Sequence, residues 1–217
     1  MTLNQIENCR KDKGWDLSNK VLYDLCTQHF SHDTTEEILA KTLLIGRAYA
    51  AAIERRKTKN KNEINDNFYI DIVAPALKKS NLDESLLHLK SYSQISLENL
   101  PHIINAHSLL TSTLFEITKL EKRSFSSKYL HFHLPQLFFI YDSRAVSAMR
   151  LFIKSLPKEL KELSDKNNVD KQYSTFAYKC FFIRDKIYKQ YQILLSPREL
   201  DNLLMEIANN KSLNLKN

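Results

Sequence analysis

Glycine occurs at only two positions in this chain of 217 residues, Gly14 and Gly46. Sandwiches and barrels need many tight turns, and such turns favour glycine because they require positive φ angles. The sequence also cannot contain GxGxxG or GxxxxGK[ST], so the usual signals of Rossmann and Walker-type nucleotide binding are missing. The scarcity of glycine therefore predicts an all-α protein.

The spacing of apolar residues supports this prediction, because it follows the period of a helix and no strand pattern persists. Residues 1–14 are polar and are expected to be irregular, whereas the run 137–141 is expected to be a short extended segment. Ser196, Pro197 and Glu199 have the pattern of a helix N-cap, first turn and capping box. The predicted helices cover about 18–30, 33–57, 66–79 with a break at Pro75, 81–90, 96–120, 125–134, 142–150, 171–192 and 196–209.

The chain carries a formal net charge of +7, with a pI of about 9.2. A basic surplus favours polyanionic partners, because neutralising phosphates releases counterions. A merely basic, soluble surface is the alternative. The basic stretch 57–62 is expected to be either a solvated linker or a loop that touches phosphates. The length is sufficient for one domain, with 1–120 and 121–217 as candidate lobes.

Three isolated cysteines, Cys9, Cys26 and Cys180, show neither zinc-site spacing nor the even count of a disulfide framework. We expect them to be reduced and mostly buried. The N-terminus has no apolar signal-peptide core, and no apolar run reaches transmembrane length. We therefore expect a cytoplasmic protein that does not enter the membrane.

The block 121–150 combines residues that suit nucleophilic chemistry. Its hydroxyl residues are suited to capping a helix, which predicts that Lys128 lies in the first turn and that Leu134-Pro135 ends the helix. Asp142 is expected at the start of the next helix. A partly buried lysine at a helix N-terminus has a lowered pKa, and its neutral amine can form a Schiff base. A nearby carboxylate can position a proton or stabilise a cationic sugar.

This block resembles helix-hairpin-helix DNA glycosylases. Ile140-Tyr141-Asp142-Ser143-Arg144 is similar to their pattern P-[VI]-D-[TV]-H, and Ser127-Lys128 is similar to their lysine position. The resemblance implies a two-lobed helical bundle with the active site in the cleft between the lobes. It also implies that Lys128 attacks C1′, that Asp142 activates the lysine or stabilises the oxocarbenium-like centre, and that Arg144 replaces the family's histidine.

The chain departs from the family at the glycine-rich hairpin L-P-G-[VI]-G, where residues 120–125 contain no glycine. The resemblance then requires side chains to anchor the DNA phosphates. His131 and His133 are two residues apart, so a helix points them to different faces, and we expect one buried and one facing the cleft. We expect neither a metal nor an organic cofactor. Residues expected to contact DNA or substrate are Lys122, Arg123, Ser124, Ser126, Ser127, His131, Arg144, Trp15 and Tyr49.

Trp15, the only tryptophan, is interpreted either as a core anchor or as a base-pocket or wedge residue. The resulting hypothesis is a monomeric DNA glycosylase that flips a damaged or modified base out of a duplex and excises it. A lysine nucleophile implies that β-elimination can follow, as in an AP lyase. DNA repair and antiviral defence against modified phage DNA both suit this activity. The alternatives are a non-catalytic helical nucleic-acid-binding protein and a helical interaction protein without nucleic-acid contacts.

Overall fold

A computed structural model describes residues 1–11, 14–54, 67–165 and 169–214, and it contains helices but no strand in these ranges. The predicted all-α class is confirmed. The basic stretch 57–62 lies outside the described residues. The elements are α1 (Leu3–Cys9), α2 (Gly14–Gln28), α3 (Thr35–Ala48), the π-helix η1 (Tyr69–Val73), α4 (Ala74–Lys79), α5 (Leu82–Leu89), α6 (Leu100–Thr118), α7 (Arg123–His133), α8 (Ser143–Phe152), α9 (Lys158–Asp165), α10 (Lys171–Tyr191) and α11 (Pro197–Asn214).

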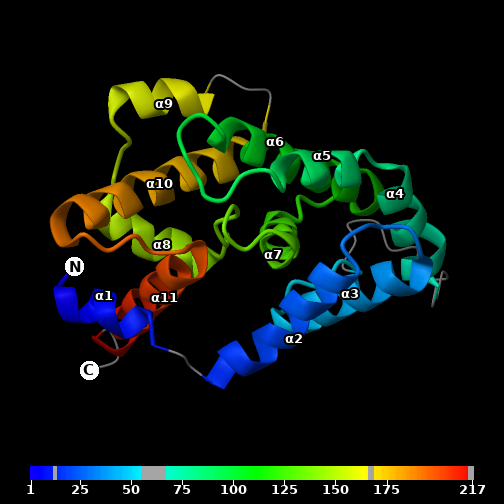
Figure 1. The fold of residues 1–217 in the computed structure, drawn as a ribbon, viewed down its shortest axis with the longest axis horizontal. Helices are drawn as coiled ribbons and strands as arrows, with labels where there is room; N and C mark the ends of the chain where they lie inside the picture. Colours follow the sequence, from blue (N-terminus) through cyan, green and yellow to red (C-terminus); the bar gives the residue numbers. More distant parts are fainter. Residues whose placement is uncertain (12–13, 55–66, 166–168, 215–217) are drawn as a thin grey trace.

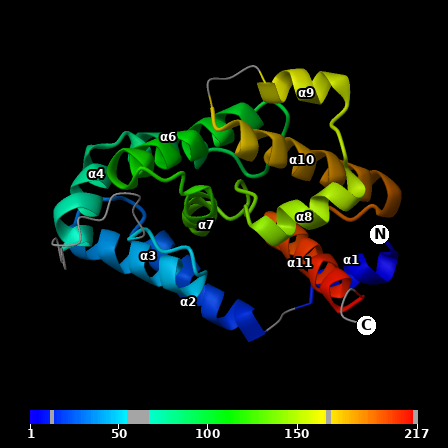
Figure 2. The ribbon, with the colours of Figure 1, turned by 180° about the vertical axis from the view of Figure 1, so that it is seen from behind.

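Helix α7 is the central element of the fold (Figure 1). It contacts α2, α3 and α6, while α8 packs on α11, α11 packs on α1, and α10 packs on α6 and α9. The view from behind shows the same arrangement, with α2 and α3 to one side of α7 and α8 and α11 to the other (Figure 2). Within the described part of the chain, no helix is both long and apolar enough to span a membrane.

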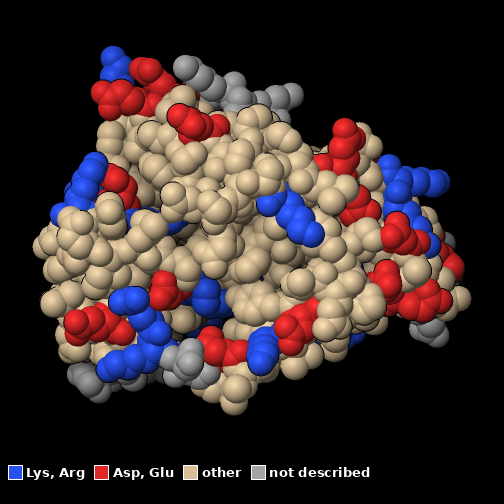
Figure 3. Space-filling model, in the orientation of Figure 1, with Lys and Arg blue, Asp and Glu red and all other residues tan. Residues whose placement is uncertain are grey.

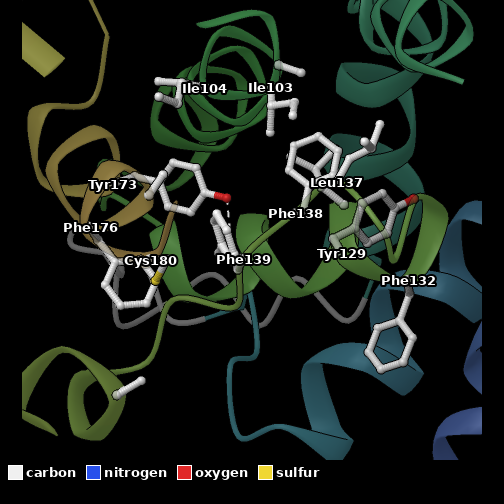
Figure 4. Packing of buried hydrophobic residues seen from close by; sticks show 14 of the residues in the cluster. Ile103, Ile104, Tyr129, Phe132, Leu137, Phe138, Phe139, Tyr173, Phe176 and Cys180 are labelled. Carbon is white, nitrogen blue, oxygen red and sulfur yellow. Dashed lines mark hydrogen bonds between the residues drawn. The ribbon is translucent and has the colours of Figure 1, made fainter. Parts of the chain in front are cut away.

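The non-helical segment 137–141 runs through the core beside α7 and α10 (Figure 4). Buried backbone groups outside a helix or sheet need other hydrogen-bond partners. Here side chains supply them: His131 Nδ1 donates to Phe138 O at 2.9 Å, and Tyr173 Oη donates to Phe139 O at 3.1 Å. The Tyr141 N–H donates to Ser127 Oγ at 2.9 Å. Polar side chains thus fix the path of the segment that leads to Asp142.

Side-chain caps set several helix starts, as the sequence predicts. Thr34 caps α3, Asp142 caps α8, and Ser196 with Glu199 forms the capping box of α11. Two expectations at the N-terminus are wrong. Residues 3–9 form α1, which is capped by Thr2, and α2 begins at Gly14, before the predicted start near residue 18.

Two long helices end without glycine. Lys119 after α6 and Gln192 after α10 adopt left-handed conformations with φ of 54° and 57°. Glycine is instead used for close packing at Gly46, where an added Cβ would lie 3.3 Å from Ala52 Cα. Close approach of α3 to the following turn therefore explains one of the two glycines.

Candidate functional site

A cleft of about 690 Å³ is lined by side chains from α2, α3, α7, α8 and α11. Figure 3 shows Lys and Arg surface set back in a hollow beside α11. The residues that line the cleft are Trp15, Asp16, Asn19, Ala48, Tyr49, Ala50, Lys128, Asp142, Arg144, Arg198, Asn202, Met205, Glu206, Asn209 and Asn210. Most were not singled out in the sequence, because they come together from both ends of the chain.

Lys128 lies in the middle of α7 and not in its first turn, because the helix already begins at Arg123. Its side chain is almost fully buried, at 2% exposure, although it lines the cleft. Lys128 Nζ donates to Ser124 Oγ at 2.6 Å and to the main-chain oxygen of Tyr141 at 3.2 Å. Its distance to Asp142 Oδ2 is 3.6 Å, which is an ion pair and not a direct hydrogen bond.

Burial lowers the pKa of Lys128, whereas the carboxylates of Asp142 and Asp201 act in the opposite direction and the Arg198 guanidinium adds to the lowering. The cause is therefore desolvation and not the dipole of α7, since the lysine lies well inside the helix. A lysine with a depressed pKa supplies more neutral amine near neutral pH than an exposed lysine does. The lowered pKa that the sequence predicted is present, with a different physical origin.

Asp142 lies opposite Lys128 in the wall of the cleft. Its side chain caps α8 by accepting from the Arg144 N–H at 2.9 Å through Oδ1, which leaves Oδ2 facing Lys128. The exposed Arg144 side chain places Nε 3.7 Å from Asp142 Oδ1. Lys128 and Asp142, 14 residues apart in the sequence, are thus brought together because the buried segment 137–141 turns back along α7.

Arg198 on α11 is a cleft residue that the sequence reasoning missed. It donates from Nη2 to Tyr49 Oη at 3.0 Å, from Nε to Tyr23 Oη at 3.3 Å and from Nη1 to Asp201 Oδ2 at 3.2 Å. Burial opposes its charge, but the influence of Tyr23, Tyr49 and Asp201 is larger and raises the pKa of Arg198. Arg198 is therefore a fixed, charged guanidinium beside Lys128 in the cleft.

The hydroxyl protons of the two tyrosines point away from Arg198. His131 Nδ1 donates to Phe138 O, so Nε2 is the acceptor and Tyr23 Oη donates to it at 2.8 Å. Tyr49 Oη donates to Asn19 Oδ1 at 2.5 Å. Each hydroxyl oxygen consequently presents a lone pair to the guanidinium, which is the arrangement needed to hold a cation.

Trp15 lies at the rim of the cleft and is 68% exposed, so its interpretation as a core anchor is wrong. Tyr49 also lines the cleft, and its ring centroid lies 5.9 Å from Lys128 Nζ. The aromatic residues available to a flat ligand are therefore an exposed indole at the rim and a half-buried phenol close to the lysine.

Several residues expected at a DNA interface lie elsewhere. Ser126, Ser127 and His131, which were expected to contact DNA or substrate, have no exposed surface, and Ser127 and His131 bond to the segment 137–141. His133 is buried as well, which corrects the expectation that one of the two histidines faces the cleft.

The residues before and at the start of α7 also have other partners. Arg123 forms ion pairs with Glu121 and Asp170, and Lys122 Nζ donates to Ala52 O at 3.4 Å. Ser124 uses its Oγ to accept from Lys128. Ser124 therefore positions the lysine, and the basic pair 122–123 is engaged within the fold.

In the described ranges, no three His, Cys, Asp or Glu side chains lie close enough together to hold a metal ion. No family model, curated protein or solved structure matches this chain.

Proposed function

We propose that this chain is a DNA glycosylase in which Lys128 and Asp142 act on a nucleotide held in the cleft. One observation carries the proposal: a nearly buried lysine ammonium lies 3.6 Å from a carboxylate in the wall of a cleft of about 690 Å³. That volume lies within the range of roughly 300–1,000 Å³ typical of small-molecule pockets. The net charge of +7 supports a polyanionic substrate.

The residues supply each step of base removal. Asp142 accepts a proton from the Lys128 ammonium, and the freed lone pair of Nζ attacks C1′. The bond between C1′ and the base nitrogen breaks, its electron pair leaves with the base, and the base takes up the proton that Asp142 accepted. Nζ then releases a proton and its lone pair expels O4′, so the C1′–O4′ bond breaks, O4′ takes up that proton, and a protonated Schiff base joins Nζ and C1′. Loss of a C2′ proton and departure of the 3′ phosphate would complete a β-elimination.

The remaining cleft residues suit a flipped base. The ring of Tyr49 offers a stacking surface near Lys128, and the exposed indole of Trp15 can fill the space that the flipped base vacates. The fixed guanidinium of Arg198 can donate to a carbonyl oxygen on the base.

The test is incubation with duplexes that carry damaged or modified bases, and with phage DNA, followed by measurement of abasic sites, strand breaks and borohydride-trapped adducts. We expect the wild type to release a base, and Lys128→Ala and Asp142→Asn to abolish release while DNA binding persists. Lys158→Ala, an exposed lysine on α9, is the control and should be fully active. DNA binding with neither base release nor a trapped adduct would favour the non-catalytic nucleic-acid-binding protein.

A further inference from the structure

A second hollow, of about 430 Å³, lies against α8 and α10 and is lined by Tyr141, the residue before Asp142. Three cationic side chains from the two helices gather at it, together with two polar side chains and an aromatic wall. These residues are Arg150, Lys171, Lys179, Gln172, Thr175 and Tyr141. The chemistry proposed for Lys128 and Asp142 does not use this hollow.

Its positive charge is not neutralised by the protein. Among the residues that the structure describes, Arg150 and Lys171 are exposed and form no ion pair. Lys179 Nζ is held by the main-chain oxygens of Ile153 and Lys154, at 3.1 and 3.2 Å, which are neutral acceptors. The hollow therefore presents three cations without a paired carboxylate.

The two carboxylates that act on the Tyr141 hydroxyl have an ion-pair partner of their own. Glu121 and Asp170 both act on the Tyr141 hydroxyl, but both are ion-paired with Arg123. The Tyr141 ring packs edge-on against Phe176, with ring centroids 5.2 Å apart, and Tyr141 Oη donates to Gln172 Oε1 at 3.3 Å. The aromatic wall of the hollow is thus fixed from two sides.

Tyr141 also connects the hollow to the cleft. Its main-chain oxygen accepts from Lys128 Nζ, its ring lines the hollow, and the next residue, Asp142, lines the cleft. Consecutive residues of one segment therefore line the hollow and the cleft.

We propose that Arg150, Lys171 and Lys179 form a phosphate-binding site for the DNA strand next to the nucleotide in the cleft. The identity of the ligand as DNA rests on the proposed glycosylase function. Arg150 and Lys171 close on the phosphate oxygens from two helices, and Lys179 is preoriented by its carbonyl contacts. This site takes the place of the phosphate anchor that the engaged residues Lys122 and Arg123 do not provide.

The test compares two double variants that lose the same charge. Arg150→Gln/Lys171→Gln removes the two exposed cations of the hollow, and Lys158→Gln/Lys161→Gln removes two exposed cations of α9. Binding of a fluorescent DNA duplex is measured from about 50 to 200 mM salt, over which each neutralised phosphate adds about 0.9 to the slope of log K against log salt. Thermal unfolding checks that both variants fold.

We expect the hollow variant to bind more weakly, with a salt slope smaller by about one for each phosphate that it no longer neutralises, and the α9 variant to keep the wild-type slope. Equal slopes in both variants, or no duplex binding by the wild type, would overturn the proposal. If the wild type releases a base but the hollow variant keeps the wild-type slope, the phosphate site is contradicted and the glycosylase proposal is not. If the hollow variant has a smaller slope but no lysine adduct forms, the phosphate site is supported and the glycosylase proposal is contradicted.

Discussion

The guanidinium of Arg198 donates to Tyr49 Oη at 3.0 Å and lies 5.7 Å from the centroid of the same tyrosine ring. Tyr49 in turn donates its hydroxyl proton to Asn19, so two hydrogen bonds fix the position of the hydroxyl group. Lys128 Nζ lies 5.9 Å from the same ring centroid. One tyrosine ring therefore lies close to two of the three cations that line the cleft, Lys128 and Arg198.

Arg198→Lys should impair the proposed base release and leave the fold intact. Lysine keeps the positive charge, but its single ammonium cannot reproduce the planar fork that bonds Tyr23, Tyr49 and Asp201. We expect kcat/KM for base release to fall by at least about tenfold, which corresponds to about 1.4 kcal/mol of transition-state stabilisation. Tyr23→Phe, which removes one hydrogen bond of the three, is the graded control. Unchanged kinetics for Arg198→Lys would mean that charge alone matters here.

The yield of Schiff base should rise with pH and level off below the pH at which an ordinary lysine titrates. Burial lowers the pKa of Lys128, and only the neutral amine attacks. The measurement is borohydride trapping on a duplex with a preformed abasic site, which needs the lysine but no base release. Asp142→Asn removes a charge that raises this pKa, so its midpoint should move to lower pH. A midpoint shifted upward in this variant would contradict the assigned pairing.

Replacement by methionine should destabilise the protein at the buried Lys41 and leave its stability nearly unchanged at the buried Lys128. Lys41 Nζ satisfies the carbonyls of His29 and Ser31 at 2.7 Å each, so Lys41→Met should cost about 1–3 kcal/mol by leaving them unpaired. After Lys128→Met, Asp142 keeps its Arg144 contacts and Tyr141 O keeps Ser127 Oγ at 3.4 Å. We expect its free energy of unfolding to stay within about 1 kcal/mol of wild type. Urea unfolding at neutral pH measures the free energy of unfolding of both variants.

The activity of the same variants separates function from structure. Lys128→Met should retain the fold and lose the trapped adduct, whereas Lys41→Met should lose stability and retain trapping at temperatures where it is folded. A large loss of stability in Lys128→Met would instead identify Lys128 as a structural residue and would weaken the proposed function.

Local signals in the sequence predicted much of this architecture. The caps Asp142 and Ser196 are recognisable because a helix start depends on residues within one turn. The same logic misplaced the start of α7, because buried hydroxyls such as Ser127 resemble caps until their partners in 137–141 are known. Composition could not show that these hydroxyls serve a non-helical segment and not a helix end.

The cleft depends on contacts that no local pattern encodes. Arg198 meets Tyr49 across 149 residues and Tyr23 across 175 residues, so its role could not be found from spacing. Lys128 and Asp142 were found because they lie in one short block whose turn brings them together. The sequence also could not decide whether Trp15 is buried or exposed, because a single tryptophan has no periodicity from which to predict its burial.

Glycine at a left-handed helix end should stabilise the protein. Gln192 has a φ of 57°, a conformation that costs a residue with a Cβ roughly 1 kcal/mol. We expect Gln192→Gly to raise the free energy of unfolding by up to about 1 kcal/mol, less the entropy that glycine loses on folding. Lys189→Gly, inside the last turn of α10, is the control and should destabilise by about 1 kcal/mol. Destabilisation by both would contradict the strain argument.

Acid should destabilise the protein in part through His107. This side chain is fully buried, stacks on Tyr173 with ring centroids 3.4 Å apart, and bonds through Nε2 to Arg123 O at 3.3 Å. Burial lowers its pKa to about 4. Below pH 6.5 His107 is protonated in the unfolded state but stays neutral in the folded state. Its contribution to the free energy of unfolding is therefore complete above pH 6.5 and is lost as the pH falls towards 4. The loss from this residue is about 3 kcal/mol, at about 1.36 kcal/mol per pH unit.

His107→Gln removes this titration and keeps a donor that can reach Arg123 O. Its free energy of unfolding should therefore fall less steeply than that of wild type between pH 7 and pH 4, whatever the offset at neutral pH. The exposed His88→Gln variant is the matched control, and its pH dependence should follow the wild type. Urea unfolding at several pH values gives the slopes directly. Parallel curves for all three proteins would mean that the acid sensitivity comes from other buried groups, since a neutral glutamine cannot take up the proton that His107 binds on unfolding.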